Sequence, residues 1–61
     1  MLYELIEIGF DKSIETKEGL IEIAQVHCSS FEDRQKFLPI DTLKKAINYF
    51  NCNGFIVKKL N

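Results

Sequence analysis

The residues best suited to chemistry are a histidine and a cysteine that adjoin, His27 and Cys28. A cysteine hydrolase needs a histidine near its thiol and a third group that orients the histidine. Neighbouring residues of a helix point about 100° apart, so these two side chains cannot form such a pair together. Cys52 could approach His27 only through the fold. We therefore expect His27 and Cys28 to fill an apolar helix stripe, and we predict no catalytic residue.

Other reactive groups are too few or too scattered to form a site. A zinc site needs about four ligands at recognisable spacing, which two separate cysteines and one histidine do not supply. The carboxylates Glu4, Glu7, Asp11 and Glu15 could be imagined as an acid–base pair, but they lie on a predicted strand and turn, where solvated side chains are usual. The three glycines stand alone and form no phosphate-binding loop. We expect neither a metal nor a cofactor.

The length of 61 residues allows one domain, residues 1–61. A core of this size rarely supplies more than roughly 3–5 kcal/mol. Apolar residues (46%) and charged residues (28%) are in the proportions of a globular protein. No stretch approaches the roughly 20 apolar residues of a membrane span, and the first ten residues lack the basic start of a signal peptide. We expect a cytoplasmic protein with reduced cysteines, a disulfide between Cys28 and Cys52 being the less favoured alternative.

Alternation of side chains predicts a strand within residues 2–10. Its more apolar face carries Leu2, Ile6, Ile8 and Phe10, with Glu4 as the exception. Tyr3 falls on the other face with Leu5 and Glu7, so we expect its ring to be exposed. The segment that follows, 11–15, is polar and typical of a turn.

Three helices are predicted in the middle of the chain. Thr16 is a suitable N-cap for the first, whose apolar stripe extends from Leu20 to Cys28. Ser29, with Glu32 three residues later, matches a capping box for a short helix from Phe31 to about Phe37.

The third helix follows Pro39, which ends the short helix. We expect Asp41 to cap it and an apolar stripe of Leu43, Ile47 and Phe50 to face the core. Tyr49 falls off this stripe and is therefore expected to be exposed.

Gly54 suits the left-handed residue after a helix, and residues 55–60 then predict a second strand. A rival interpretation is a hairpin over residues 47–57 that turns at Asn53-Gly54. The favoured order gives an α+β fold: a small two-layer β-α-(α)-α-β domain with two antiparallel strands packed against helices.

The charges divide the chain into two parts. Residues 1–33 carry a net charge of −6, and residues 34–61 carry +5. If the two strands are antiparallel, Glu4 and Glu7 lie near Lys58 and Lys59, where each opposed pair contributes roughly 0.2–1 kcal/mol. Strand pairing could therefore account for part of the division. The remaining basic residues are on the second and third helices, where they could contact an acidic partner or nucleic acid.

These patterns favour a small non-enzymatic module that binds a larger protein and regulates or inhibits it. In size and composition the chain resembles accessory proteins of viruses and mobile elements. The candidate partner-binding residues are Tyr3, Glu4, Glu7, Arg34, Lys36, Lys44, Lys45 and Tyr49. The alternative is a nucleic-acid-binding regulator that uses the basic C-terminal half. We also expect a homodimer formed by pairing at the exposed edge of the first strand, with strand addition to a target as the competing outcome.

Overall fold

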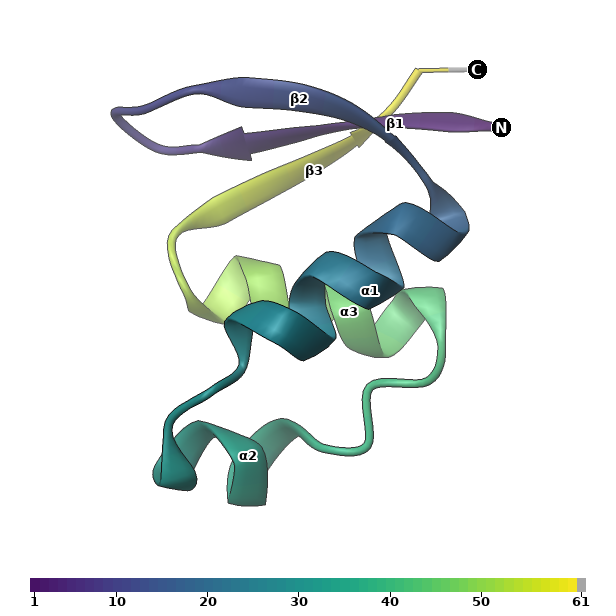
Figure 1. The fold of residues 1–61 in the computed structure, drawn as a ribbon. Coiled ribbons are helices and arrows are strands. Elements are labelled where there is room, and N and C mark those ends of the chain that lie inside the picture. Colours follow the sequence, from purple (N-terminus) through teal and green to yellow (C-terminus); the bar gives the residue numbers. More distant parts are fainter. Residues whose placement is uncertain (61) are drawn as a thin grey trace.

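A computed structural model describes residues 1–60, which form a three-stranded antiparallel sheet with helices on one side of it (Figure 1). The elements in chain order are β1 (Leu2–Glu7), β2 (Lys12–Thr16), α1 (Lys17–His27), α2 (Phe31–Phe37), α3 (Leu43–Cys52) and β3 (Phe55–Lys59). The α+β class predicted from the sequence is confirmed, and so are the three helices and the two predicted strands.

The third strand, β2, was missed by the sequence prediction, so the expectation of a two-stranded sheet is wrong. Residues 11–15 were expected to be a turn, but the turn comes earlier, where Phe10 N donates to Glu7 O (2.9 Å) and Gly9 has φ +85°. Ile14 is the one large apolar residue of β2, and the strand is mostly exposed. With no buried face to produce an apolar pattern, β2 is defined by its backbone pairing with β1 alone.

The sheet order is β2-β1-β3, which places β1 in the centre. Leu5, for example, lies opposite Ser13 on β2 and Val57 on β3. The prediction that the first strand has an open edge is therefore wrong, because both edges of β1 are already paired, so neither a second copy nor a target's strand can pair there. Homodimer formation itself stays a prediction. In the part of the chain that the structure describes, the edge strands are β2 and β3.

The predicted placement of opposite charges on β1 and β3 is confirmed at one position, although the ion pair that Glu4 forms is with Lys12 of β2. Glu4 lies opposite Lys58, as expected for antiparallel strands. Glu7, by contrast, lies opposite Phe55 at the far end of β3, away from the two lysines.

The helices cover the face of β1 that the sequence did not favour. Tyr3 and Leu5 point into the core and are 7% and 6% exposed. The strand ends at Glu7, so Ile8 and Phe10 belong to the hairpin turn rather than to a strand face. Counting these two turn residues made the wrong face of β1 look more apolar.

The core lies between the sheet and the pair α1 and α3. Its buried residues are Tyr3, Leu5, Leu20, Ala24, Cys28, Ile40, Ala46, Tyr49 and Phe50. Phe50 faces the core as predicted, whereas Leu43 and Ile47 are half-buried. Ala46, Tyr49 and Phe50 define the buried face at spacings of three and four, so the core-facing side of α3 is rotated from the predicted stripe.

Side chains cap all three helices. Thr16 Oγ1 accepts from Gly19 N (3.1 Å), as predicted. For α2 and α3 the N-caps are Ser30 and Thr42, each one residue after the predicted Ser29 and Asp41.

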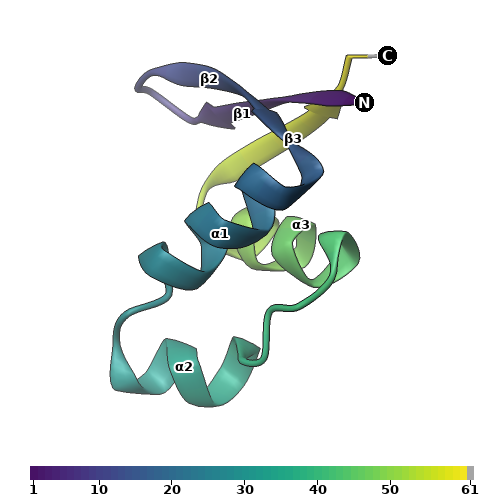
Figure 2. The same ribbon diagram turned by 45° about the vertical axis from the view of Figure 1, so that its right-hand side comes forward.

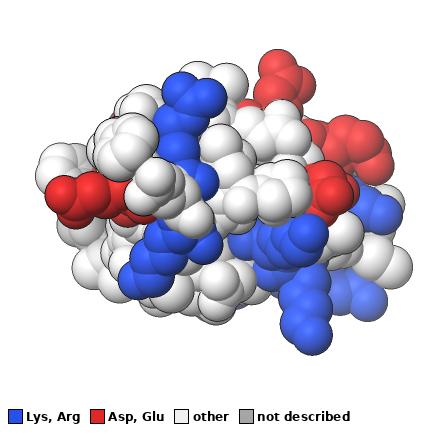
Figure 3. All heavy atoms as spheres, turned by 90° about the horizontal axis from the view of Figure 1, so that it is seen from below, with Lys and Arg blue, Asp and Glu red and all other residues white. Residues whose placement is uncertain are grey.

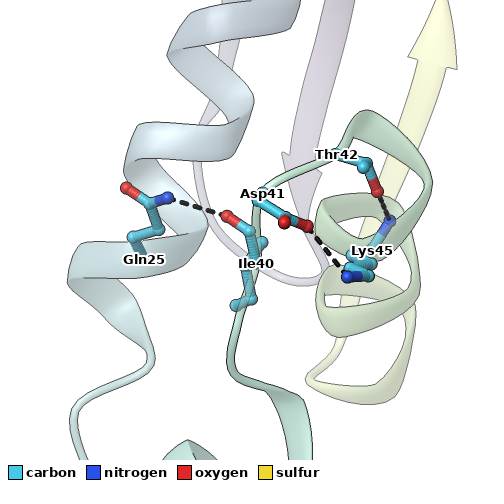
Figure 4. A network of polar contacts seen from close by, with 5 residues as sticks. All are labelled: Gln25, Ile40, Asp41, Thr42 and Lys45. Carbon is cyan, nitrogen blue, oxygen red and sulfur yellow. Dashed lines mark hydrogen bonds and ion pairs between the residues drawn. The ribbon is translucent and has the colours of Figure 1, made fainter.

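Asp41 instead accepts a hydrogen bond from Lys45 Nζ (2.9 Å), one helical turn away (Figure 4). In the same segment, Gln25 Nε2 of α1 donates to Ile40 O (2.7 Å). These two bonds and the buried Ile40 side chain attach the α2–α3 connection to both long helices.

The turn after α3 excludes the rival hairpin at Asn53-Gly54. The helix continues to Cys52, Gly54 takes φ +82°, and β3 pairs with β1 rather than with the preceding residues. The longest helix has 11 residues, and no helix in the described residues is long and apolar enough to cross a bilayer.

Candidate functional site

One face of the sheet has no helix over it. Residues directly opposite each other on antiparallel strands share a face, so the side of β1 that does not meet the core continues onto β2 and β3. We call this surface the outer sheet face; its residues are Leu2, Glu4, Ile6, Lys12, Ile14, Ile56, Lys58 and Leu60. Figures 1 and 2 show all three helices on the opposite side of the sheet. This face is therefore open to a partner along its whole length.

The outer sheet face is more apolar than an ordinary solvated surface. Ile14 and Ile56 are 62% and 43% exposed, and Leu2 and Leu60 are exposed as well. Several exposed apolar side chains on one face of a small protein are typical of an interaction site. At the hairpin tip next to it, Ile8 and Phe10 are also exposed.

The charges on this face are arranged around one carboxylate. Glu4 Oε2 lies 3.6 Å from Lys12 Nζ on β2, and Lys58 on β3 is the residue opposite Glu4 on its other side. Lys12 forms the ion pair with Glu4, and Lys58 adds a second positive charge, which leaves the face with a small net positive charge. A complementary surface would be apolar with acidic groups beside it.

The two tyrosines predicted to be exposed are in the core. Tyr3 is almost fully buried and Tyr49 completely so. The Tyr49 hydroxyl shares a hydrogen bond with His27 Nδ1 (2.5 Å), and burial raises the pKa of Tyr49. Neither ring can contact a partner in this structure, so the prediction that they are exposed is wrong. The error arose because the side of β1 that carries Tyr3 and the side of α3 that carries Tyr49 were predicted to face solvent.

His27 and Cys28 point to different surroundings. The His27 ring packs edge-on against Tyr49 and Phe55, with centroid distances of 5.7 and 5.4 Å. Cys28 is 2% exposed; burial raises the pKa of its thiol, Asp33 adds to the rise and Arg34 opposes it. A thiol in this state is a poor nucleophile.

Both thiols are free. Cys52, which could have approached His27 through the fold, is exposed at the end of α3. Among residues 1–60, no three His, Cys, Asp or Glu side chains are grouped so that they could hold a metal ion.

The predicted basic residues lie on the helical side of the molecule. Arg34 and Lys36 are on α2, and Lys44 and Lys45 are in the first turn of α3. Seen from below, basic side chains are spread over this face with uncharged surface between them and acidic side chains beside them (Figure 3). The structure thus separates these four residues from Glu4, which is on the outer sheet face, and from Glu7, the last residue of β1.

A hollow beside the sheet was not predicted from the sequence. A hollow of about 480 Å³ lies between β2 and α1, lined by Glu15, Gly19, Glu22, Ile23, Val26 and His27. A side chain at position 19 would place its Cβ 3.0 Å from Glu15 Oε1, so glycine makes room for this carboxylate. The sequence signal was Gly19 itself, a helix-weakening residue within a first turn.

No protein-family model matches the chain, and no curated protein and no solved structure matches it either. The function must therefore be inferred from the surfaces described above.

Proposed function

We propose that this chain is a small non-enzymatic protein-binding domain that docks on a larger protein through its outer sheet face and modifies the activity of that protein. The single observation that supports this is the uncovered apolar sheet face, where Ile14 and Ile56 remain exposed although the opposite face of the same sheet is buried. The complementary partner surface is apolar and carries acidic groups that meet Lys12 and Lys58. Two free thiols fit a reducing compartment, so we place the protein in the cytoplasm.

We propose the outer sheet face as the contact surface because it exposes large apolar side chains, whereas the helical side exposes mainly separate charged side chains. Apolar surface provides most of the driving force of protein association, whereas exposed charges contribute little each. On the helical face, the exposed lysines are spread out, and Lys45 is already paired with Asp41. A second copy of this chain competes with the larger protein for the same apolar surface.

The test is capture of a partner from a lysate by the immobilised full chain, followed by mass spectrometry and measurement of the affinity for the purified partner. The double variant Ile14→Thr/Ile56→Thr keeps β-branched residues on both strands but removes apolar surface. We expect it to lose the partner while its melting temperature stays close to that of the wild type. The matched control is Phe31→Ser on α2, which removes an apolar side chain that is 74% exposed but far from the sheet in sequence and on the helical side.

If both variants retain the partner, the outer sheet face is not the contact surface. Light scattering at micromolar concentration distinguishes the second copy: a dimer that dissociates in the double variant assigns the face to self-association.

Nucleic-acid binding is the alternative function, and it has less support. Base stacking requires exposed aromatic rings beside basic residues. Phe31 on α2, the helix that carries Arg34 and Lys36, is one such ring, but Tyr49, the aromatic residue nearest in sequence to Lys44 and Lys45, is buried. Nucleic-acid affinity that falls steeply with salt would favour this alternative, because phosphate contacts release counterions.

A further inference from the structure

Strand β2 offers a second binding element, its outer backbone edge. Glu7 N donates to Asp11 O (3.2 Å), and hydrogen bonding alternates along an antiparallel pair. Ser13 and Glu15 therefore direct their N–H and C=O groups toward β1, while Lys12 and Ile14 direct theirs away from the sheet. A strand placed beside β2 would find these groups at the correct spacing to continue the ladder.

The hollow between β2 and α1 lies next to this edge, on the helical side of the sheet. Its lining includes the apolar side chains of Ile23 and of Val26, which is 75% exposed. Glu15 and Glu22 line the same hollow, and neither carboxylate is in an ion pair within residues 1–60. The lining includes no lysine or arginine. The hollow thus combines two apolar side chains with two carboxylates that have no ion-pair partner within residues 1–60.

Resting on the proposed protein-binding function, we propose that β2 binds an extended segment of a partner with lysine or arginine at alternate positions. Such a segment adds a fourth strand to the sheet. Every second side chain then points to the helical side, where its aliphatic stem covers Ile23 and Val26 and its cationic head meets Glu15 and Glu22. The size of the hollow, about 480 Å³, is in the range of sites that hold a few side chains.

The experiment uses the isotope-labelled full chain and a capped nonapeptide of alternating valine and lysine. We expect binding to shift the amide signals of β2 and of α1 around Glu22, and to slow hydrogen exchange of the Lys12 and Ile14 amides. Two comparison peptides test the chemistry: alternating valine and glutamate tests the charge, and a proline-substituted version tests the backbone ladder, because proline lacks the N–H. Neither is expected to bind.

The double variant Glu15→Gln/Glu22→Gln should weaken binding of the lysine peptide roughly fivefold, as for two partly exposed ion pairs. The matched control is Glu32→Gln, an exposed carboxylate on α2 outside the hollow. Absence of binding at millimolar peptide overturns the proposal, as does equal binding of the glutamate or proline peptide, or shifts confined to the outer sheet face.

The outcome is independent of the outer sheet face. Ile56→Thr on β3 should leave the affinity for the lysine peptide unchanged, because Ile56 is not at the edge of β2. A chain that captures a partner but does not bind the peptide contradicts only the strand-addition proposal, whereas a chain that binds the peptide but captures no partner contradicts only the proposed role of the outer sheet face.

Discussion

The two faces of the sheet carry similar residues and meet different surroundings. On the helical side, Tyr3 and Leu5 are 7% and 6% exposed, whereas on the other side Ile14 and Ile56 are 62% and 43% exposed. Both faces present large apolar side chains, so hydrophobicity alone does not determine which one is covered. The covered face is the one against which α1 and α3 pack: the chain turns at Thr16 from β2 into α1, and at Gly54 from α3 into β3. The apolar face that the fold leaves open is the outer sheet face, which we propose as the surface for association.

The largest effect is expected deep on the covered side, at Phe50. This side chain is completely buried and packs against Tyr49 and Phe55, with centroids 5.8 and 5.2 Å away. Phe50→Ala should cost roughly 3–5 kcal/mol, about the whole stability of a domain of this size. Circular dichroism should show a chain largely unfolded at room temperature. A variant with the wild-type melting curve would mean that α3 is not packed on this face.

The stability cost of truncating Leu5, on the covered face, can be compared directly with that of truncating Ile14, on the outer sheet face. Leu5→Ala should lower the free energy of unfolding by roughly 2–5 kcal/mol, because it leaves a cavity between β1 and the helices. Urea titration followed by circular dichroism measures this value. If Leu5→Ala costs no more than a typical surface substitution, the helices cover the other face of β1.

The stability of the chain at alkaline pH tests the burial of the Cys28 thiol on the covered side, and it does so without removing a large side chain. The pKa of Cys28 is raised by burial from its ordinary value near 9.0. The unfolded chain then releases this proton at lower pH than the folded chain, so the contribution of Cys28 is complete below pH 9 and is lost as the pH rises through the folded pKa. The free energy of unfolding should fall as the pH rises above about 9, and it should fall less in Cys28→Ala. Equal slopes for the two proteins would place Cys28 in contact with solvent.

The smallest effect is expected on the open face. Ile14→Ala should change the free energy of unfolding by no more than about 0.5 kcal/mol, since the side chain is largely solvated in the folded state. The same urea titration as for Leu5→Ala makes the comparison direct. A cost of several kcal/mol, accompanied by dissociation of a dimer in light scattering, would show that a second copy covers this face.

Periodic patterns, cap residues and Pro39 were enough to predict most of the elements. The short helix was predicted at its observed bounds, Phe31–Phe37, and Thr16 was predicted as the cap of α1. The stripes of α1 and α3 were long enough to indicate helices, although Tyr49 was assigned to the wrong side of α3.

What could not be predicted depends on contacts between distant residues. β2 has no buried side chain, so only its pairing with β1 reveals it. The same missing strand made β1 look like an edge. Of the predicted partner-binding residues, Glu4 alone is on the outer sheet face. Tyr3 and Tyr49 are buried because the helices pack on the side of β1 and the side of α3 that the sequence pattern had indicated to be exposed.

The pairing of β1 with β3 also brings the two ends of the described chain together: Leu60 N donates to Leu2 O (2.9 Å), and both ends leave the sheet at the same corner (Figure 1). A short peptide linker could join them and new ends could be opened in the exposed α2, giving a circular permutant with every strand pairing intact. In that permutant β1 and β3 become neighbours in sequence, which lowers the contact order of the sheet. Its folding should accelerate while its native structure stays the same.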